Sequence, residues 1–333
     1  MRCSREPAAL AYGRRAAAGQ REEHSNSMSG TRMGESGGAN RYDRRTADLG
    51  NSVELGHVNV TIPDQLKATA FYISGLGLTR DPYLMTGIDN MWVNVGASSQ
   101  FHLPAGKPQV LRGRTGLLLP DLAALLDRLA AARKWLDGTA FSFREGDGFV
   151  DVTCPWGNRL RCHRPDAARF GRRTLGMPYV RFDVPQGAAP GIARFYREML
   201  GMPGAVAEEE GAPAARVSVA ADQWLIFRET DAPLPPFDGH HIQITLADFS
   251  GPHARLLERG LITEESNEHQ YRFTDIVDLD SGKVLFAVEH EVRSMRHPMF
   301  GRRLVNRNPA VNNRNFMPGH EDWAPAMPPA ELA

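Results

Sequence analysis

Four segments of this chain open in the same way, with an alternating strand that ends in a short turn. They read His57-Val-Asn-Val-Thr-Ile-Pro-Asp64, Arg114-Thr-Gly-Leu-Leu-Leu-Pro-Asp121, Tyr179-Val-Arg-Phe-Asp-Val-Pro185 and His241-Ile-Gln-Ile-Thr-Leu-Ala-Asp248. Their first residues lie 57, 65 and 62 positions apart. Repetition at such a regular spacing indicates a chain built from modules, each too small to bury both faces of its own sheet.

A helix and three further strands follow each opening strand. In the second repeat, leucines recur at the spacing of one helical face from Leu122 onward. Glycine follows three of the helices, where it adopts the left-handed conformation most cheaply: Gly77, Gly201 and Gly260. The last two strands form hairpins that turn at Gly157 and Gly282 in the second and fourth repeats. We therefore predict an α+β fold of four tandem βαβββ modules, which pair into two open, cleft-forming β-barrels.

The composition of the remaining parts predicts how the chain is divided. Residues 1–50 are rich in Arg, Gly, Ser and Ala and lack an apolar period, so we expect a disordered N-terminal tail. Residues 51–165 and 176–292 each contain two modules, with a linker between them. Residues 293–333 read as an irregular C-terminal tail, for which wrapping back over the folded body is one arrangement.

Bulk composition narrows the class of partner. Lysine plus arginine and aspartate plus glutamate number 39 each, which argues against a nucleic-acid or anionic-membrane surface. No run of 18 apolar residues is present, so we expect no membrane span. Three cysteines without a CxxC motif fit a reducing compartment, and we expect a cytoplasmic protein. The expected partner is a small organic substrate or ligand, and a homodimer stays open.

These repeats resemble the vicinal oxygen chelate superfamily, which includes glyoxalase I, extradiol dioxygenases, fosfomycin-resistance enzymes and bleomycin-binding proteins. The resemblance covers about residues 53–292 and is carried by the strand openings at His57 and His241, the Phe71-Tyr72-x4-Gly77 helix end and the Trp156-Gly-Asn-Arg-Leu hairpin. It implies paired modules that curl into an open barrel around a cleft. It also implies a divalent metal held by side chains from first and fourth strands.

The family places one ligand, usually His, at the start of the first strand. In this sequence those positions are His57, Arg114, Tyr179 and His241. It places a second ligand, usually Glu, about four residues past the last hairpin glycine. The corresponding positions are His102 in the first module, Arg161 in the second, Leu225 or Phe227 in the third and Phe286 in the fourth. With no Glu among them, glyoxalase I activity is not expected, and the extradiol pattern of His, His and Glu is incomplete.

Two pairings of the modules stay open. If the first pairs with the fourth, His57, His102 and His241 converge in one cleft, and three neutral imidazoles suit Fe(II), or otherwise Zn, Ni or Mn. If neighbours in sequence pair, His57 and His102 share one cleft while His241 and Tyr179 share the other. Two ligands rarely hold a catalytic metal, although the strand end around Glu289 offers a further donor if the strand is shifted.

Other positions carry more than one interpretation. Tyr179 and Arg114 are our candidates for catalytic roles, as a hydrogen-bond donor and as an anion-binding group. The alternatives are that Tyr179 forms part of the wall and that Arg114 and Arg161 pair with acids at the barrel rim. Each histidine can equally be a hydrogen-bonded barrel residue. Trp92 is expected to line the cleft or fill the core.

Two functions follow from this pattern. The first is a metal-dependent dioxygenase or related enzyme that acts on a small organic molecule, with His57, His102 and His241 as metal ligands. The second is a metal-free protein that binds a small molecule, as bleomycin-resistance proteins do. The retained histidines favour the first, and the missing glutamates favour the second.

Overall fold

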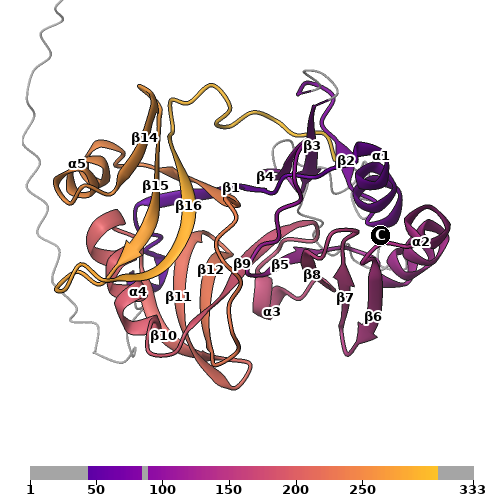
Figure 1. The fold of residues 1–333 in the computed structure, drawn as a ribbon, viewed down its shortest axis with the longest axis horizontal. Helices are drawn as coiled ribbons and strands as arrows, with labels where there is room; N and C mark the ends of the chain where they lie inside the picture. The colour runs from indigo at the N-terminus through magenta and orange to yellow at the C-terminus, as the bar shows by residue number, and fades with distance from the viewer. Residues whose placement is uncertain (1–43, 85–88, 307–333) are drawn as a thin grey trace, which may run out of the picture. The chain divides into compact units, whose positions relative to one another are not determined.

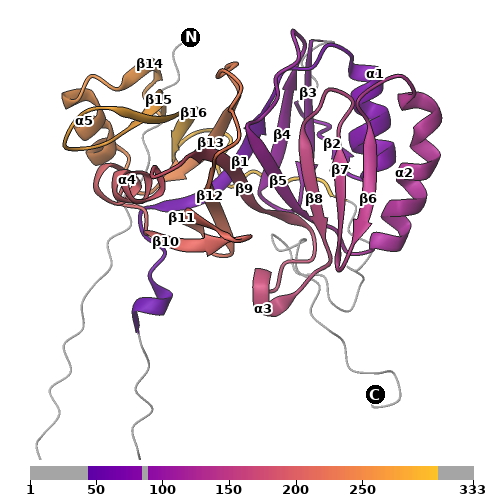
Figure 2. The same cartoon turned by 60° about the horizontal axis from the view of Figure 1, so that its bottom comes forward.

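The first module pairs with the fourth. In the computed structural model, which describes residues 44–84 and 89–306, these two modules form an eight-stranded sheet. Its strands run in the order β14 (Ile262–Asn267), β15 (Gln270–Val277), β16 (Val284–Ser294), β13 (His241–Leu246), β1 (Ser52–Asn59), β4 (Ser99–Pro104), β3 (Asn90–Val95) and β2 (Thr79–Arg80). The opening strands β1 and β13 join the modules as an antiparallel pair at its centre (Figures 1 and 2).

The second module pairs with the third in the same way. The second sheet has the order β10 (Gly204–Glu209), β11 (Ala212–Ala220), β12 (Gln223–Thr230), β9 (Gly176–Pro185), β5 (Gly113–Leu118), β8 (Arg159–His163), β7 (Phe149–Thr153) and β6 (Ser142–Gly146). Strands β5 and β9 form its central antiparallel pair. Neither sheet closes into a complete barrel, because each has two different edge strands. The predicted α+β fold of four βαβββ modules in two open sheets is confirmed.

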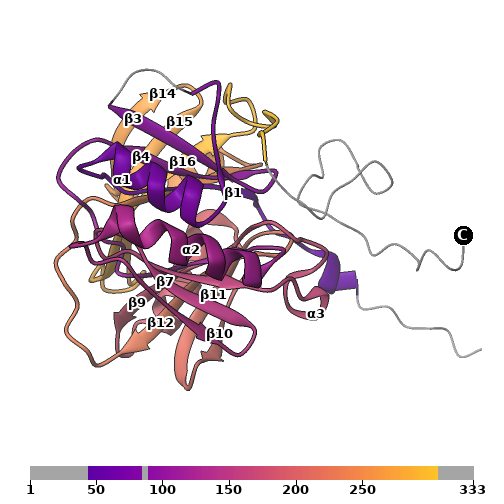
Figure 3. The same ribbon diagram turned by 90° about the vertical axis from the view of Figure 1, so that its right-hand side faces the viewer.

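One helical segment follows each opening strand. These segments are α1 (Gln65–Ala68) with the π-helix η2 (Thr69–Gly75), α2 (Leu122–Leu136), α4 (Ala189–Phe195) with the π-helix η3 (Tyr196–Leu200), and α5 (Ser250–Glu258). Aspartates that end the strand turns cap two of them: the Asp64 carboxylate accepts from the backbone of Leu66 and Lys67, and Asp121 caps α2. Helix α2 packs against η2, so the first two modules are in contact through their helices (Figure 3).

Two short elements lie outside the modules. The 3-10 turn η1 (Arg44–Ala47) precedes the first strand, and α3 (Ala167–Phe170) lies in the predicted linker. Our expectation of disorder falls mostly on residues 1–43, which lie outside the described residues. None of the described helices has the length and apolar character needed to cross a membrane.

The chain after β16 crosses from the fourth module to the first, as Figure 1 shows in yellow. We call residues 295–306 the strap. Arg302 forms an ion pair of 2.6 Å with the buried carboxylate of Asp81, and the Asn94 side chain donates to the carbonyl of Val305 at 2.9 Å. The strap contains no helix or strand, and it wraps back over the first module. Residues 307–333 lie outside the described part.

Aromatic side chains join the two sheets. Phe286 of β16 lies 5.7 Å from Phe182 of β9 and 6.1 Å from Phe227 of β12, measured between ring centroids. All three rings are buried in the main hydrophobic cluster. Burying an aromatic side chain stabilises a fold by roughly 1.5–3 kcal/mol. Phe286 is therefore a core residue, which matters for the position that the sequence analysis assigned to it.

Candidate metal centre

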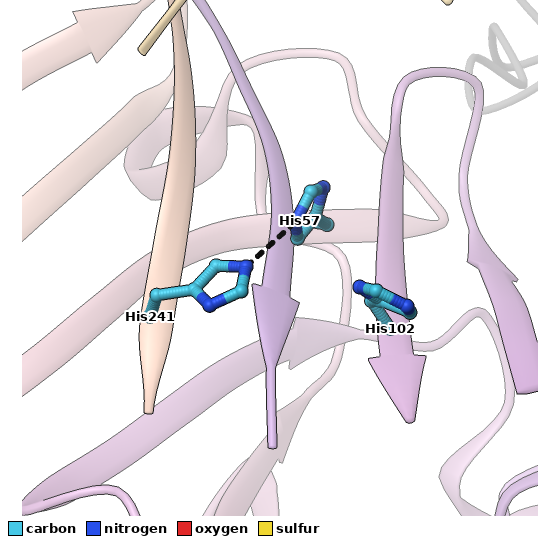
Figure 4. Close-up of side chains that lie close together, drawn as sticks. All are labelled: His57, His102 and His241. Atoms are coloured by element: carbon cyan, nitrogen blue, oxygen red, sulfur yellow. Dashed lines mark hydrogen bonds between the residues drawn. The ribbon is translucent and has the colours of Figure 1, made fainter. Parts of the chain in front are cut away.

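Three histidines from three adjacent strands converge on one point. His57 lies on β1, His102 on β4 and His241 on β13 (Figure 4). Each offers one ring nitrogen, and these nitrogens lie within 4.8 Å of one another. The Nε2 atoms of His57 and His241 are 3.3 Å apart. Nitrogens that bind one ion at about 2.1 Å in tetrahedral geometry are about 3.4 Å apart. The structure thus brings together all three residues that the sequence singled out as ligands.

The register of the central strands produces this convergence. Asn59 of β1 lies directly beside His102 of β4 on one side and His241 of β13 on the other. His57, two residues earlier, lies opposite Gln243 and points to the same face. A slip of one residue would turn a strand's histidine to the opposite face. The site therefore depends on pairing the first module with the fourth.

The same register identifies a residue that the sequence analysis missed. In the fourth module Gln243 pairs with Glu291, just as Asn59 pairs with His102 in the first. Glu291 is therefore the counterpart of His102, and the assignment of Phe286 to that position is corrected. The fixed offset fails because β16 is 11 residues long and its pairing with β15 contains register shifts. The alternation Glu289-His-Glu291-Val-Arg293 was the available signal, because it places three charged residues on one face.

The Glu291 carboxylate completes the group. Its Oε2 atom lies 3.5 Å from Nε2 of His241 and 4.0 Å from Nε2 of His57. Two arginines neutralise it: Arg272 approaches Oε2 and Arg293 approaches Oε1, each at 2.6 Å. Burial opposes ionisation, but the neighbouring groups outweigh it and hold the pKa of Glu291 well below its usual range. The carboxylate is therefore charged at neutral pH.

Burial keeps two of the histidines, His57 and His102, in the neutral form that can bind a metal. Burial lowers the pKa of His57 well below its usual value and that of His102 to about 3. Both ring nitrogens of His102 are buried, and neither has a hydrogen-bond partner among the described residues. Leaving a buried polar group unsatisfied costs about 1–3 kcal/mol. Three imidazoles beside one carboxylate are a donor set that fits a divalent transition metal.

Neighbouring side chains fix the orientation of the rings. Nδ1 of His241 lies 3.1 Å from Glu289, which is itself held by Arg272 at 2.6 Å. When Nδ1 of His241 carries the ring proton and donates it to Glu289, Nε2 of the same ring has a free lone pair. That lone pair points toward His57. The Trp92 ring stacks on His102 with centroids 3.9 Å apart and an interplanar angle of 12°. Trp92 thus forms one wall of the site.

The strap covers the part of the cleft next to His57. A small cavity of about 30 Å³ adjoins His57, and its lining includes Gln100, Gln243 and Arg293. Four strap residues complete the lining: Met299, Phe300, Arg302 and Leu304. That volume holds about one or two water molecules. With the strap in this position, the cavity is too small for an organic substrate.

The structure does not bring Arg114 and Tyr179 to the three histidines. Arg114 lies on β5 and Tyr179 on β9, the central strands of the second sheet. The Tyr179 hydroxyl is buried and shares a hydrogen bond of 2.8 Å with Nε2 of His163. These residues belong to a second cleft, because the second module pairs with the third.

Comparison with known proteins supports the fold. A scan against models of protein families finds no match, and no curated protein sequence matches the chain. Among solved structures, glyoxalase I from Zea mays has a TM-score of 0.52 and 12% identity, covering 72% of this chain and 92% of that chain. A candidate dioxygenase from Bacillus subtilis subsp. subtilis str. 168 has a TM-score of 0.49 and 14% identity, covering 75% and 87%. A 2,3-dioxygenase from Pseudomonas sp. KL28 has a TM-score of 0.28 and 13% identity, covering 80% and 97%. The first of these alignments shows that this chain has the vicinal oxygen chelate fold.

Proposed function

We propose that this protein, which has the vicinal oxygen chelate fold, is a metal-dependent enzyme, and most simply a dioxygenase acting on a small organic molecule. The observation that carries the proposal is the convergence of His57, His102 and His241 beside the carboxylate of Glu291. The group contains the set of two histidines and one carboxylate that is typical of non-haem Fe(II) oxygenases, with one further histidine beside it. Fe(II) is therefore the favoured ion, and Zn, Ni or Mn are the alternatives.

The residues around the site have separable tasks in this proposal. His57, His102, His241 and Glu291 would hold the ion. When bound, a ferrous ion would supply open coordination positions at which a substrate and dioxygen meet. Glu289 keeps the lone pair of His241 directed inward, and Trp92 keeps the His102 ring in place and excludes water from one side.

Asn59 is a candidate for substrate positioning. It lies between His102 and His241 in the sheet register, and its side chain is buried. Its Oδ1 atom has no hydrogen-bond partner within the described part of the chain. A buried acceptor beside the ligands would accept a hydrogen bond from a substrate hydroxyl group, which restores its lost hydration. A substrate that enters beside His57 would require the strap to move, because the cavity there is about 30 Å³.

Purification without chelator, followed by metal analysis and oxygen-uptake measurements, tests the proposed function. We expect close to one equivalent of metal per chain. After anaerobic loading with Fe(II), oxygen uptake should depend on a small aromatic vicinal diol, the simplest probe with two adjacent oxygen donors. The His241→Ala variant should show neither property. Metal binding without oxygen uptake across a panel of such diols would contradict the dioxygenase assignment. It would still agree with a metal-dependent enzyme of another class.

One observation favours a second candidate function, that of a metal-free binding protein. Arg272 and Arg293 already lie against the Glu291 carboxylate, so its charge is balanced without an ion. A protein that takes up no metal at micromolar Fe(II), Zn or Ni would support this second candidate. The unpaired nitrogens of His102 weigh against it, because hydrogen bonding to protein leaves them unsatisfied.

Replacing Glu289 with glutamine should weaken metal binding about 10- to 100-fold, the usual effect of removing a partner that orients a ligand histidine. The amide keeps the size of the side chain but no longer selects the tautomer of His241 as strongly. Competition with a chromophoric chelator measures the affinity. Glu258→Gln is the matched control, because Glu258 is exposed on α5. Equal affinities for the two variants would show that Glu289 does not orient the ligand.

A further inference from the structure

The second sheet has a cleft whose lining is rich in arginine. Arg114 pairs with Arg181 and Gly116 with Tyr179, so Arg114 and Tyr179 occupy the positions that His57 and His241 hold in the first sheet. In β8 the counterpart of His102 is Arg161, which pairs with Gly116. Two of the three positions that hold histidines in one cleft therefore carry guanidinium groups in the other, and the third carries the Tyr179 phenol. Such a cleft repels a metal ion and attracts an anion.

Three guanidinium groups already converge on one carboxylate. Glu210 accepts from Arg161 at 2.8 Å through Oε1 and from Arg181 at 2.6 Å through Oε2, and Arg114 also contacts Oε1. The side chains of Arg114 and Arg181 are only 9% and 7% exposed, whereas that of Glu210 is 37% exposed. Planar guanidinium forks bind carboxylate and phosphate groups better than any other side chain does. The cluster is thus shaped to hold an oxyanion.

The arginines around this cavity outnumber the carboxylates of the described residues that pair with them. Five arginines line the cavity beside this cluster: Arg114, Arg144, Arg159, Arg161 and Arg181. Their ion pairs within the described residues reach three carboxylates, those of Asp151, Asp183 and Glu210. In addition, the buried Nε atoms of Arg114 and Arg181 have no hydrogen-bond partner there. An incoming anion would therefore reduce the excess of positive charge and satisfy buried donors.

The cavity has the size of a small-molecule site. Its volume is about 380 Å³, and besides the arginines the strand residues that share the cleft face and line it are Ser142, Asp151 and Thr153. Sites for small organic ligands are typically about 300–1,000 Å³. The cavity therefore suits an organic molecule that carries an anionic group, rather than a bare inorganic ion alone.

Glu210 reaches the arginines from a tight turn. It lies between β10 and β11 with φ 49°, and Gly211 follows with φ 76°. A left-handed conformation is unfavourable for glutamate and needs compensation from elsewhere, which the three arginines provide. Because the turn is at the tip of a hairpin, its carboxylate can withdraw without disturbing the sheet.

We propose that this second cleft is a binding site for a small organic anion, whose carboxylate or phosphate group replaces Glu210 on Arg114, Arg161 and Arg181. Glu210 then occupies the arginines when no ligand is present, and a ligand must displace it in order to bind. The site lies on the other sheet from the histidines, so the proposal does not depend on the metal chemistry.

Calorimetric titration of the full-length protein with benzoate and with inorganic phosphate, in a buffer free of other multivalent anions, tests this site. In the Glu210→Gln variant the internal carboxylate is lost, and we expect at least one probe to bind ten-fold more tightly or better than in the wild type. The probe with the larger gain identifies the group as carboxylate or phosphate. Glu208→Gln is the matched control: it removes the same charge from an exposed position on the same hairpin and should leave binding unchanged.

A second variant keeps the test decisive if Glu210→Gln does not fold. Arg161→Gln in the otherwise native chain should weaken binding of the same probe at least ten-fold, because it removes one of the three guanidinium groups. Folding is checked by circular dichroism in each case. The proposal is overturned if folded Glu210→Gln binds neither probe more tightly than the wild type. It is also overturned if Glu208→Gln gives the same gain, or if Arg161→Gln leaves wild-type affinity intact.

Discussion

Replacing His57 with alanine is expected to abolish stoichiometric metal binding while the chain remains folded. Nε2 of His57 lies 3.3 Å from Nε2 of His241 and 4.0 Å from the Glu291 carboxylate, so it is the donor that links the two modules. Without it, the proposed site loses one of its four donors and the histidine at its centre. We expect the metal content to fall from about one equivalent to below one tenth, since each lost ligand typically costs well over ten-fold in affinity.

The control for this variant must match its burial. His57 is only 1% exposed, so its removal leaves a cavity and should lower the melting temperature as well. His163 is 2% exposed and lies on the second sheet, away from the three histidines. His163→Ala should therefore lose similar packing but retain the metal. If His57→Ala keeps its metal, or if both variants lose it equally while folded, the proposed site is wrong.

The four modules could be predicted from the sequence because the alternating strands and the glycines that end the helices indicate the same module boundaries. The strand alternation at His57, Arg114, Tyr179 and His241 repeats at nearly even spacing, and glycines end the helices between them. Gly201, for example, has φ 69° at the end of η3, as a left-handed helix end requires. Local signals of this kind are readable because they depend on neighbours in the chain.

The pairing of modules could not be read in the same way. All four opening strands have a similar apolar alternation, so any two of them could form the central antiparallel pair. The choice depends on contacts between residues far apart in sequence, such as those between Ser52–Asn59 and His241–Leu246 in the central pair of the first sheet. Once the first module pairs with the fourth, His57, His102 and His241 meet without further assumptions, and Arg114 and Tyr179 move to the other cleft.

Glu291 shows a different kind of failure. Its position was predicted by a fixed distance of about four residues from the hairpin glycine, which holds for Arg161 but not in the longer and irregular β16, where Glu291 lies nine residues past Gly282. The alternation of charged residues from Glu289 to Arg293 was a better guide than this distance, because it shows which residues share a face.

Replacing Glu291 with alanine should destabilise the protein by about 3–5 kcal/mol, the usual cost of removing one partner from a buried ion pair. Its side chain is 4% exposed and neutralises Arg293, whose side chain is 14% exposed, as well as part of the charge of Arg272. Arg272 retains Glu289, but Arg293 is left with a buried and uncompensated charge. Urea unfolding followed by circular dichroism measures the loss, and Glu268→Ala, at an exposed position, is the control.

The structural and metal-binding roles of Glu291 can be separated. In the double variant Glu291→Met with Arg293→Met, both charges are removed and most of the lost stability should return, because the two side chains of similar length fill the same space. Metal binding should not return, since methionine offers Fe(II) no carboxylate. Added metal should raise the unfolding free energy of the wild type by mass action and leave the double variant unchanged. A double variant that regains both stability and metal would remove Glu291 from the site and leave the three histidines as the complete ligand set.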